Sequence, residues 1–114
     1  MTADRMRRVD EAVREVLSDA ISLKLKDPRV GFVTVTAVET APDLRRARVF
    51  VSVLGEQGVR KRSMQGLQSA HGILQRAVAG ELRLRHTPTL EFVYDDTTER
   101  GLRIAELIDR EAGE

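Results

Sequence analysis

Gly72 is the residue of this sequence whose type and position most directly suggest chemistry, and that chemistry is the binding of phosphate groups. It stands in the stretch SAHGILQRA, inside a long helical pattern and four residues before Arg76. Glycine within a helix costs about 0.5–1 kcal/mol relative to alanine. A kink between a helix ending near Ala70 and one beginning at Ile73 would expose backbone amides and let a sugar-phosphate backbone approach closely.

Gly55 and Gly58 form a second glycine motif, G-E-Q-G, which VRKR follows directly. The motif matches the G-x-x-G pattern with which KH domains clamp a nucleic-acid backbone. That clamp lies between two helices, whereas Gly55 and Gly58 follow a predicted strand, so we interpret them as loop residues. The alternative for Gly72 is that it has no binding role and that the helix merely accommodates a glycine there. Gly66 and Gly80 lie in the same helical segment, so this segment accommodates other glycines.

Motifs for catalysis are missing from the sequence. It contains no G-x-S-x-G, H-E-x-x-H, G-x-x-x-x-G-K or G-x-G-x-x-G pattern. Its two histidines, His71 and His86, have no second ligand at metal spacing. Asp95 and Asp96 stand between a predicted strand and a predicted helix, where carboxylates cap free backbone amides. We therefore expect no enzyme activity, no metal and no cofactor.

The composition is typical of a single domain. With 114 residues, the chain can bury a core of its own without disulfides, so we expect one domain over residues 1–114. The absence of cysteine fits a reducing compartment. The N-terminal residues lack the apolar core of a signal peptide, and no apolar run approaches the roughly 20 residues of a membrane span. We expect a cytoplasmic protein without membrane contact.

Charge is distributed unevenly along the chain, although the net charge is only +1. Residues 59–86 carry six basic residues against one acidic residue, whereas residues 87–114 carry three against eight. This layout suits a protein that presents one face to a polyanion. Aromatic residues are few and mostly inward by pattern, which favours recognition of RNA by backbone and shape over base stacking. They are Phe32, Phe50, Phe92 and Tyr94.

The hydrophobic pattern predicts the elements that must position these residues. Apolar residues at helical spacing indicate a helix over residues 5–25, which Pro28 would end. Alternating patterns over residues 32–40 and 46–54 predict an antiparallel hairpin, with the helix covering one of its faces. The residues that the first strand is expected to turn to one side are Val33, Val35 and Ala37.

A basic helical segment follows over residues 59–86, then a third strand over residues 90–94 and a last helix. On an ideal helical wheel, the basic segment has one apolar stripe and an opposite face that collects Lys61, Arg76 and Arg83. Asp96 and Glu99 resemble a capping box at the start of the last helix. The order α-β-β-α-(α)-β-α predicts an α+β fold with a three-stranded sheet covered by helices on one face.

A series of short motifs runs through nearly the whole chain. The first half contains Asp27-Pro28-Arg29-x-Gly31-x-x-Thr34 and Asp43-Leu44-x-x-Ala47-x-Val49. The second half contains Ala70-x-Gly72, Leu82-Arg83-Leu84-Arg85-x-x-Pro88-x-Leu90-x-Phe92 and Gly101-x-x-Ile104-x-x-Leu107-Ile108. In combination, these motifs resemble the ribosome-binding factor A family.

The resemblance implies a type II KH-like domain in which a kink at Ala70-His71-Gly72 stands where other KH domains have G-x-x-G. It also implies a non-catalytic assembly factor that binds the immature small ribosomal subunit and its ribosomal RNA near the 5′ region. Such factors assist late maturation and rRNA processing, and they matter for growth in the cold. In some bacteria an assembly GTPase promotes their release, so a GTPase is an expected partner.

We predict that basic side chains contact ribosomal RNA phosphates and that the kink lets the RNA backbone approach. The acidic C-terminal helix would face away from the RNA, and the free protein is expected to be a monomer. Two alternatives stay open, a KH-type binder of another RNA and a protein-interaction module that uses the last helix. The predicted RNA-binding residues are Arg60, Lys61, Arg62, Ala70, Gly72, Arg76, Arg83 and Arg85.

Overall fold

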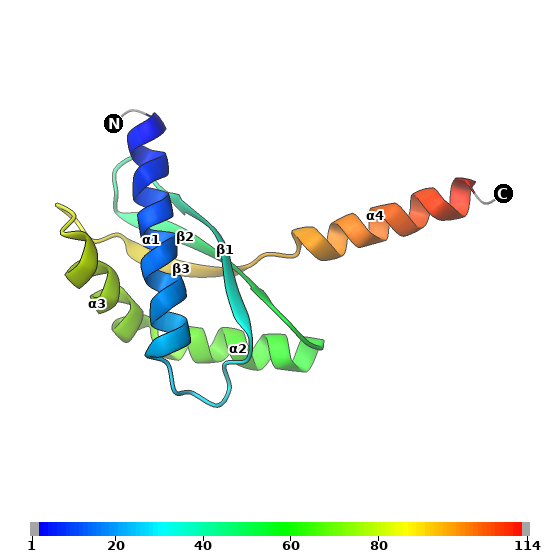
Figure 1. Ribbon diagram of the computed structural model, residues 1–114, viewed down its shortest axis with the longest axis horizontal. Coiled ribbons are helices and arrows are strands. Elements are labelled where there is room, and N and C mark those ends of the chain that lie inside the picture. The colour runs from blue at the N-terminus through cyan, green and yellow to red at the C-terminus, as the bar shows by residue number, and fades with distance from the viewer. Residues whose placement is uncertain (1–2, 113–114) are drawn as a thin grey trace.

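The computed structural model describes residues 3–112, with the side chains of all of these except residues 98, 99, 111 and 112. Helices and strands follow one another in the predicted order (Figure 1). They are α1 (Ala3–Leu23), β1 (Val33–Thr40), β2 (Arg46–Val53), α2 (Gln57–Ser69), α3 (His71–Leu82), β3 (Thr89–Tyr94) and α4 (Thr97–Ala112).

The three strands form one mixed sheet in the order β1-β2-β3. The predicted hairpin is correct, because β1 and β2 pair antiparallel, with Val33 opposite Val53. β3 pairs parallel to β2, with Arg46 opposite Thr89. Parallel neighbours need a crossover connection, which α2 and α3 provide.

Helices α1, α2 and α3 lie against one face of this sheet, as predicted, whereas α4 extends away from the body (Figure 1). The core lies between the helices and the sheet, and Leu17, Leu67 and Leu74 are fully buried in it. The α+β fold class is thereby confirmed. Four large apolar side chains of α4 are 57–61% exposed, namely Leu102, Ile104, Leu107 and Ile108.

The first helix ends at Leu23, two residues earlier than predicted, and its buried face has the expected spacing. The loop that follows is closed by Asp27, whose Oδ1 accepts the backbone N–H of Arg29 at 2.9 Å. The Asp27 carboxylate also pairs with the Arg29 guanidinium at 2.6 Å, which lowers the pKa of Asp27. Asp27 and Arg29 therefore serve the turn itself.

The inward alternation predicted for β1 is wrong beyond Val35. A β-bulge between Val35 and Ala37 inserts one extra residue into this strand. Because the insertion reverses the alternation, Ala37 is exposed, while Val38 and Thr40 are buried.

Phe32 also departs from the prediction, because it precedes β1 and is 81% exposed. Phe50 alternates with buried Val49 and Val51, so its half-buried ring lies on the face of the sheet that the helices leave open. Phe92 packs against the core as expected.

The carboxylate that caps α4 is Asp95, one residue earlier than the predicted capping box. Asp95 Oδ1 accepts the backbone N–H of Thr97 at 3.0 Å and also the Thr97 hydroxyl. Its other oxygen accepts the Thr36 hydroxyl at 2.6 Å, which joins the start of α4 to β1. Asp96 instead pairs with Arg100 at 2.6 Å, and the Glu99 side chain of the predicted box lies outside the described residues.

Candidate nucleic-acid interface

The helix break that the sequence suggested is real, but it is centred on Ala70. Helix α2 ends at Ser69 and α3 begins at His71, with Ala70 between them at φ −87° and ψ 7°. The second helix was predicted to begin at Ile73, so that prediction is wrong by two residues. Gly72 is the second residue of α3, and its φ is not positive.

Gly72 lies on an exposed surface of α3. A Cβ atom added there would meet only Arg76 Nη1, at 3.5 Å, which is ordinary van der Waals contact. The fold therefore does not require a glycine at this position. What the missing side chain leaves is an open stretch of backbone beside the Arg76 guanidinium at the start of a helix, where anions bind favourably.

Two side chains of α3, for which the sequence predicts no role, fix the break against the sheet. His71 Nε2 lies 3.0 Å from the carbonyl oxygen of Leu90 in β3. One turn later, Gln75 Nε2 donates to the carbonyl of Pro88 at 2.6 Å, and Gln75 Oε1 accepts the N–H of Leu90 at 3.2 Å. The only signal in the sequence is their spacing of four residues, which places them on one face of a helix.

Gly66 allows the loop before β1 to pack closely on α2, at another part of the candidate interface. A Cβ atom at Gly66 would lie 2.6 Å from Val30 Cγ2, because the loop before β1 packs closely on α2. Ser63 reinforces this contact, since its Oγ accepts the N–H of Gly31 at 3.1 Å and donates to the Arg29 carbonyl at 3.3 Å. Gly66 is thus required by close packing, whereas nothing lies within 4 Å of a Cβ at Gly80.

The G-E-Q-G motif is only partly a loop. Gly55 follows β2 with φ +130°, a conformation that favours glycine. Gly58 lies in the first turn of α2, which begins at Gln57, so the prediction of a loop for this residue is wrong.

The predicted basic residues differ in how far they are available to a partner. Lys61 and Arg62 are exposed on α2. Arg60 is half-buried, and its guanidinium lies 4.1 Å from the ring centroid of Tyr94, a cation–π contact that joins α2 to the end of β3. Arg60 therefore contributes to the packing of α2 on the sheet.

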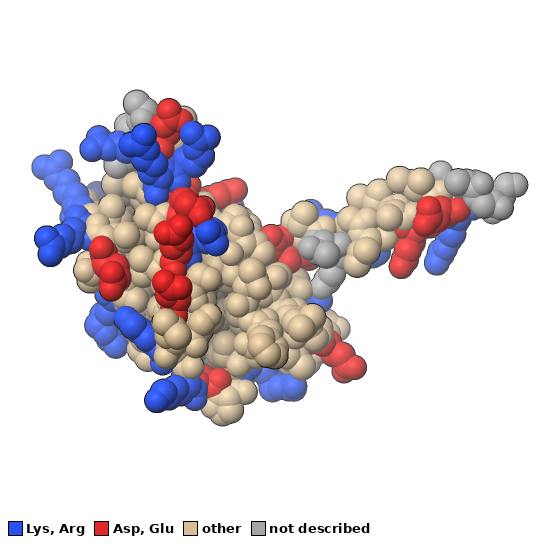
Figure 2. All heavy atoms as spheres, viewed as in Figure 1, with Lys and Arg blue, Asp and Glu red and all other residues tan. Residues whose placement is uncertain are grey.

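The remaining basic residues extend from α3 into the segment that follows it. Arg76 is exposed on α3, Arg83 is exposed at its C-terminal end with φ 32°, and Arg85 is exposed two residues later. Since α2 and α3 are separate helices, the single helical wheel predicted for residues 59–86 does not apply. In the view of Figure 2, basic side chains lie around the rim of the body, and acidic side chains form a stripe over α1.

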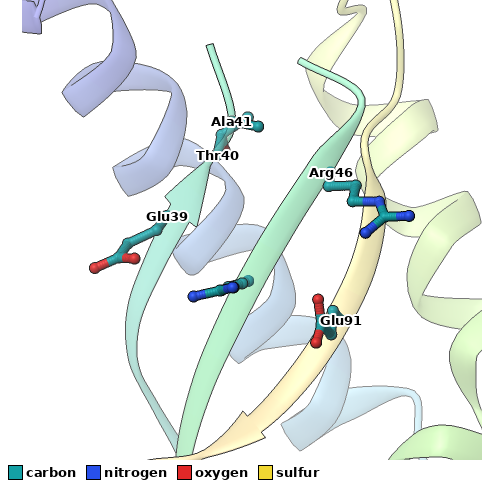
Figure 3. Close-up of a pocket in the computed structure, with 6 residues that line it drawn as sticks. Glu39, Thr40, Ala41, Arg46 and Glu91 are labelled. Carbon is teal, nitrogen blue, oxygen red and sulfur yellow. The ribbon is translucent and has the colours of Figure 1, made fainter. Parts of the chain in front are cut away.

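The open face of the sheet has a different electrostatic character. A shallow pocket of about 310 Å³ lies there, with Glu39 of β1 and Glu91 of β3 on its two sides and arginines of β2 between them (Figure 3). Arg48 stands between its cross-strand partners Glu39 and Glu91, and Arg46 is also part of the lining. Because the charges alternate across the strands, this face is less suited to a polyanion than the helix break.

Among the residues whose side chains the structure describes, no group of three or more His, Cys, Asp or Glu could hold a metal ion. No helix within residues 3–112 is long and apolar enough to cross a membrane.

These features define a small α+β domain of the KH-like class, with a basic helix–break–helix on the side of the sheet that the helices cover. The family model described as "Ribosome-binding factor A" matches residues 5–108. The chain belongs to this family.

Curated relatives are similar in sequence to this chain over nearly its whole length. The ribosome-binding factor A of Anaeromyxobacter sp. (strain K) is 52% identical over 112 residues, which cover 97% of this chain and 80% of the relative. That of Halothermothrix orenii is 43% identical over 110 residues, which cover 96% of this chain and 90% of the relative.

Solved structures show the same fold. The solution structure of a putative ribosome binding factor A from Thermotoga maritima has a TM-score of 0.72 and 34% identity, over 82% of this chain and 89% of the other. The crystal structure of ribosome-binding factor A from Thermus thermophilus has a TM-score of 0.70 and 28% identity, over 78% of this chain and 94% of the other. A homology model of the Thermus thermophilus protein was fitted into a cryo-EM map of a 30S–RbfA complex. It has a TM-score of 0.63 and 30% identity, over 76% of this chain and 91% of the other.

Proposed function

We propose that this protein is a cytoplasmic, non-catalytic assembly factor that binds the immature small ribosomal subunit. It contacts ribosomal RNA near the 5′ region, assists late maturation and rRNA processing, including at low temperature, and acts as a monomer whose release involves an assembly GTPase. The observation that carries the proposal is the family membership, together with the Thermus relative fitted into a 30S–RbfA complex.

The contact surface that we propose is the helix break and the exposed cations around it. Lys61 and Arg62 on α2, Arg76 beside the break, and Arg83 and Arg85 beyond α3 would meet phosphates. The open backbone at Gly72 would allow close approach of the RNA backbone, because only the flexible Arg76 guanidinium lies over it. Ala70 is buried, so it acts by shaping the break.

Co-sedimentation with immature small subunits tests this surface. The double variant Arg76→Glu and Arg83→Glu should lose most binding at low salt, because two cations that face phosphates become anions. The matched control is Arg103→Glu with Arg110→Glu, which changes the net charge equally on α4 and should bind as wild type. Equal binding by all three proteins would refute the surface, and failure of the wild type to co-sediment would refute the function.

The alternative of a KH-type protein for another RNA makes a different prediction. Such a protein should bind an unrelated hairpin as tightly as a ribosomal 5′-end fragment of similar length. Competition between these two RNAs for the wild-type protein separates the possibilities, since an assembly factor should prefer the ribosomal fragment.

The protein-interaction alternative is supported by one observation, the exposed apolar face of α4. Such a face on a helix that extends away from the body can bind a groove of a partner protein. If α4 carried the binding to the subunit, the charge-reversal variants at Arg76 and Arg83 would keep it.

A further inference from the structure

A groove of about 340 Å³ lies between α1 and α3, where these two helices pack against each other. Its apolar lining consists of Val16, Ala20 and Leu23 from α1 and Ala77 from α3. Ala20 and Ala77 are buried, whereas Leu23, the last residue of α1, is 78% exposed. This α1–α3 groove therefore offers apolar surface that the fold leaves partly open to a partner.

The charged residues of the α1–α3 groove are three carboxylates and one cation. Glu15 and Asp19 lie on α1, Glu81 lies on α3, and Lys24 follows the end of α1. Within the part of the chain that the structure describes, none of the three carboxylates takes part in a hydrogen bond or an ion pair. The groove thus carries unneutralised negative charge on both of its walls.

The arrangement of carboxylates on α1 does not serve the helix itself. Glu11, Glu15 and Asp19 follow one another at intervals of four residues, and like charges at this spacing destabilise a helix. Arg14 pairs with Glu11 and lies only in the wider electrostatic field of Glu15. Acidic side chains accordingly form a stripe over α1 in Figure 2. A partner that supplies cations would relieve this repulsion.

A protein segment with Lys or Arg next to apolar side chains matches both properties of the groove. Its apolar side chains would cover Leu23 and the lining beside it, and its cations would pair with the carboxylates of the two walls. RNA does not match, because the carboxylates repel phosphates. The α4 helix does not match either, since it carries four acidic residues against three basic ones.

We propose that the α1–α3 groove is a docking site for a basic, partly apolar segment of a protein partner. The groove shares no residue with the surface proposed to contact RNA. The proposal therefore goes beyond the proposed function and does not depend on it, and the two surfaces can be tested separately.

Fluorescence anisotropy with a labelled model peptide tests the proposal. The probe is a helical peptide of about 14 residues, roughly four turns, made of two copies of Leu-Lys-Lys-Leu-Leu-Lys-Leu. One comparison peptide has Glu in place of Lys, and another has Ser in place of Leu. Wild type should bind the Leu–Lys peptide more tightly than either. Glu15→Gln with Glu81→Gln should weaken this binding at least about fivefold, because each wall loses a carboxylate.

The chain offers a matched control for the charge and another for the apolar contact. Glu39→Gln with Glu91→Gln makes the same two changes at exposed glutamates that flank the pocket on the open face of the sheet, and it should bind as wild type. Leu23→Ser should weaken binding about fivefold, because apolar contact area is lost. Leu54→Ser changes a leucine that is 76% exposed outside the groove, so it should bind as wild type.

Three results would overturn the proposal: no binding of the Leu–Lys peptide by wild type, equal binding of the peptide with Glu, or an equal loss in the Glu39 and Glu91 control. The groove variants should unfold at the same urea concentration as wild type or above it. Unfolding at a lower concentration would also overturn the proposal, because the carboxylates would then serve the fold.

The outcome for the groove is distinguishable from that for the RNA surface. Arg76→Glu with Arg83→Glu, which should lose binding to small subunits, should bind the Leu–Lys peptide at least as tightly as wild type, since it adds negative charge. Loss of peptide binding in this variant would overturn the inference and leave the proposed function intact.

Discussion

Two glycines of the basic segment have opposite surroundings, so the same substitution should have opposite effects on stability. Gly66→Ala would bring Cβ to 2.6 Å from Val30 Cγ2, and a stiff β-branched side chain cannot move aside cheaply. We expect this change to lower the free energy of unfolding by about 1–3 kcal/mol. Gly80→Ala meets nothing and should raise it by about 0.5–1 kcal/mol. Urea unfolding of both variants measures the difference, and equal stabilities would contradict the packing described for Gly66.

At Gly72, stability and binding should change in opposite directions. Gly72→Ala replaces a helical glycine at a position where a methyl group fits, so we expect a gain of up to about 1 kcal/mol in the free energy of unfolding. The same methyl group would stand between the backbone and an approaching phosphate, so co-sedimentation with immature subunits should weaken. Wild-type binding by the stabilised variant would show that RNA does not approach the backbone at this residue.

Single residues show why the sequence predicts some contacts and not others. The positive charge around the break can be predicted from the sequence, because arginine and lysine carry their charge in any fold. The need for glycine at position 66 depends on Val30, which reaches it only through the tertiary packing of a loop. The contacts of His71 and Gln75 with β3 likewise join residues that periodicity cannot relate, so no role could be predicted for them.

At the scale of elements, the start of α4 depends on an ionised carboxylate. Hydrogen bonds from Thr36 and then from Thr97 lower the pKa of Asp95. A lowered pKa stabilises the folded state above the ordinary aspartate value of about 4, and this contribution is lost as the pH falls through the folded value. Asp95→Asn should therefore destabilise the protein at neutral pH more than at pH of about 3. Urea unfolding at the two pH values measures this, and an equal cost at both would contradict the role of the charge.

Periodicity predicted the helices and the hairpin because their buried faces repeat regularly. It failed in β1, because a single inserted residue at the bulge moves every later side chain to the other face. Hydrophobic periodicity also does not predict whether the amphipathic α4 packs on the rest of the protein. An apolar stripe requires only some partner, and in this chain the large apolar side chains described on α4 stay more than half exposed.

For the whole molecule, the separation of charge should appear as a salt dependence. Each phosphate that a cation neutralises contributes about 0.7–0.9 to the slope of log affinity against log salt concentration. Neutralising Arg76 and Arg83 together, as Arg76→Gln and Arg83→Gln, should therefore reduce the slope by about 1.4–1.8 units. Binding to small subunits measured over a range of salt concentrations tests this, and an unchanged slope would show that neither side chain meets a phosphate.

The parallel pairing of β2 with β3 has a consequence for when the protein can begin to act. Arg46 pairs with Thr89, so the strand that completes the sheet leaves the translating ribosome only after α2 and α3 have been made. Until β3 arrives, Leu90 and Pro88 are not there to hold His71 and Gln75, and the angle between α2 and α3 is not fixed. Because such long-range pairing forms late and slowly, the candidate interface is completed only after residues 89–94 have been synthesised. A nascent chain that lacks β3 therefore does not yet hold the helix break in its final geometry.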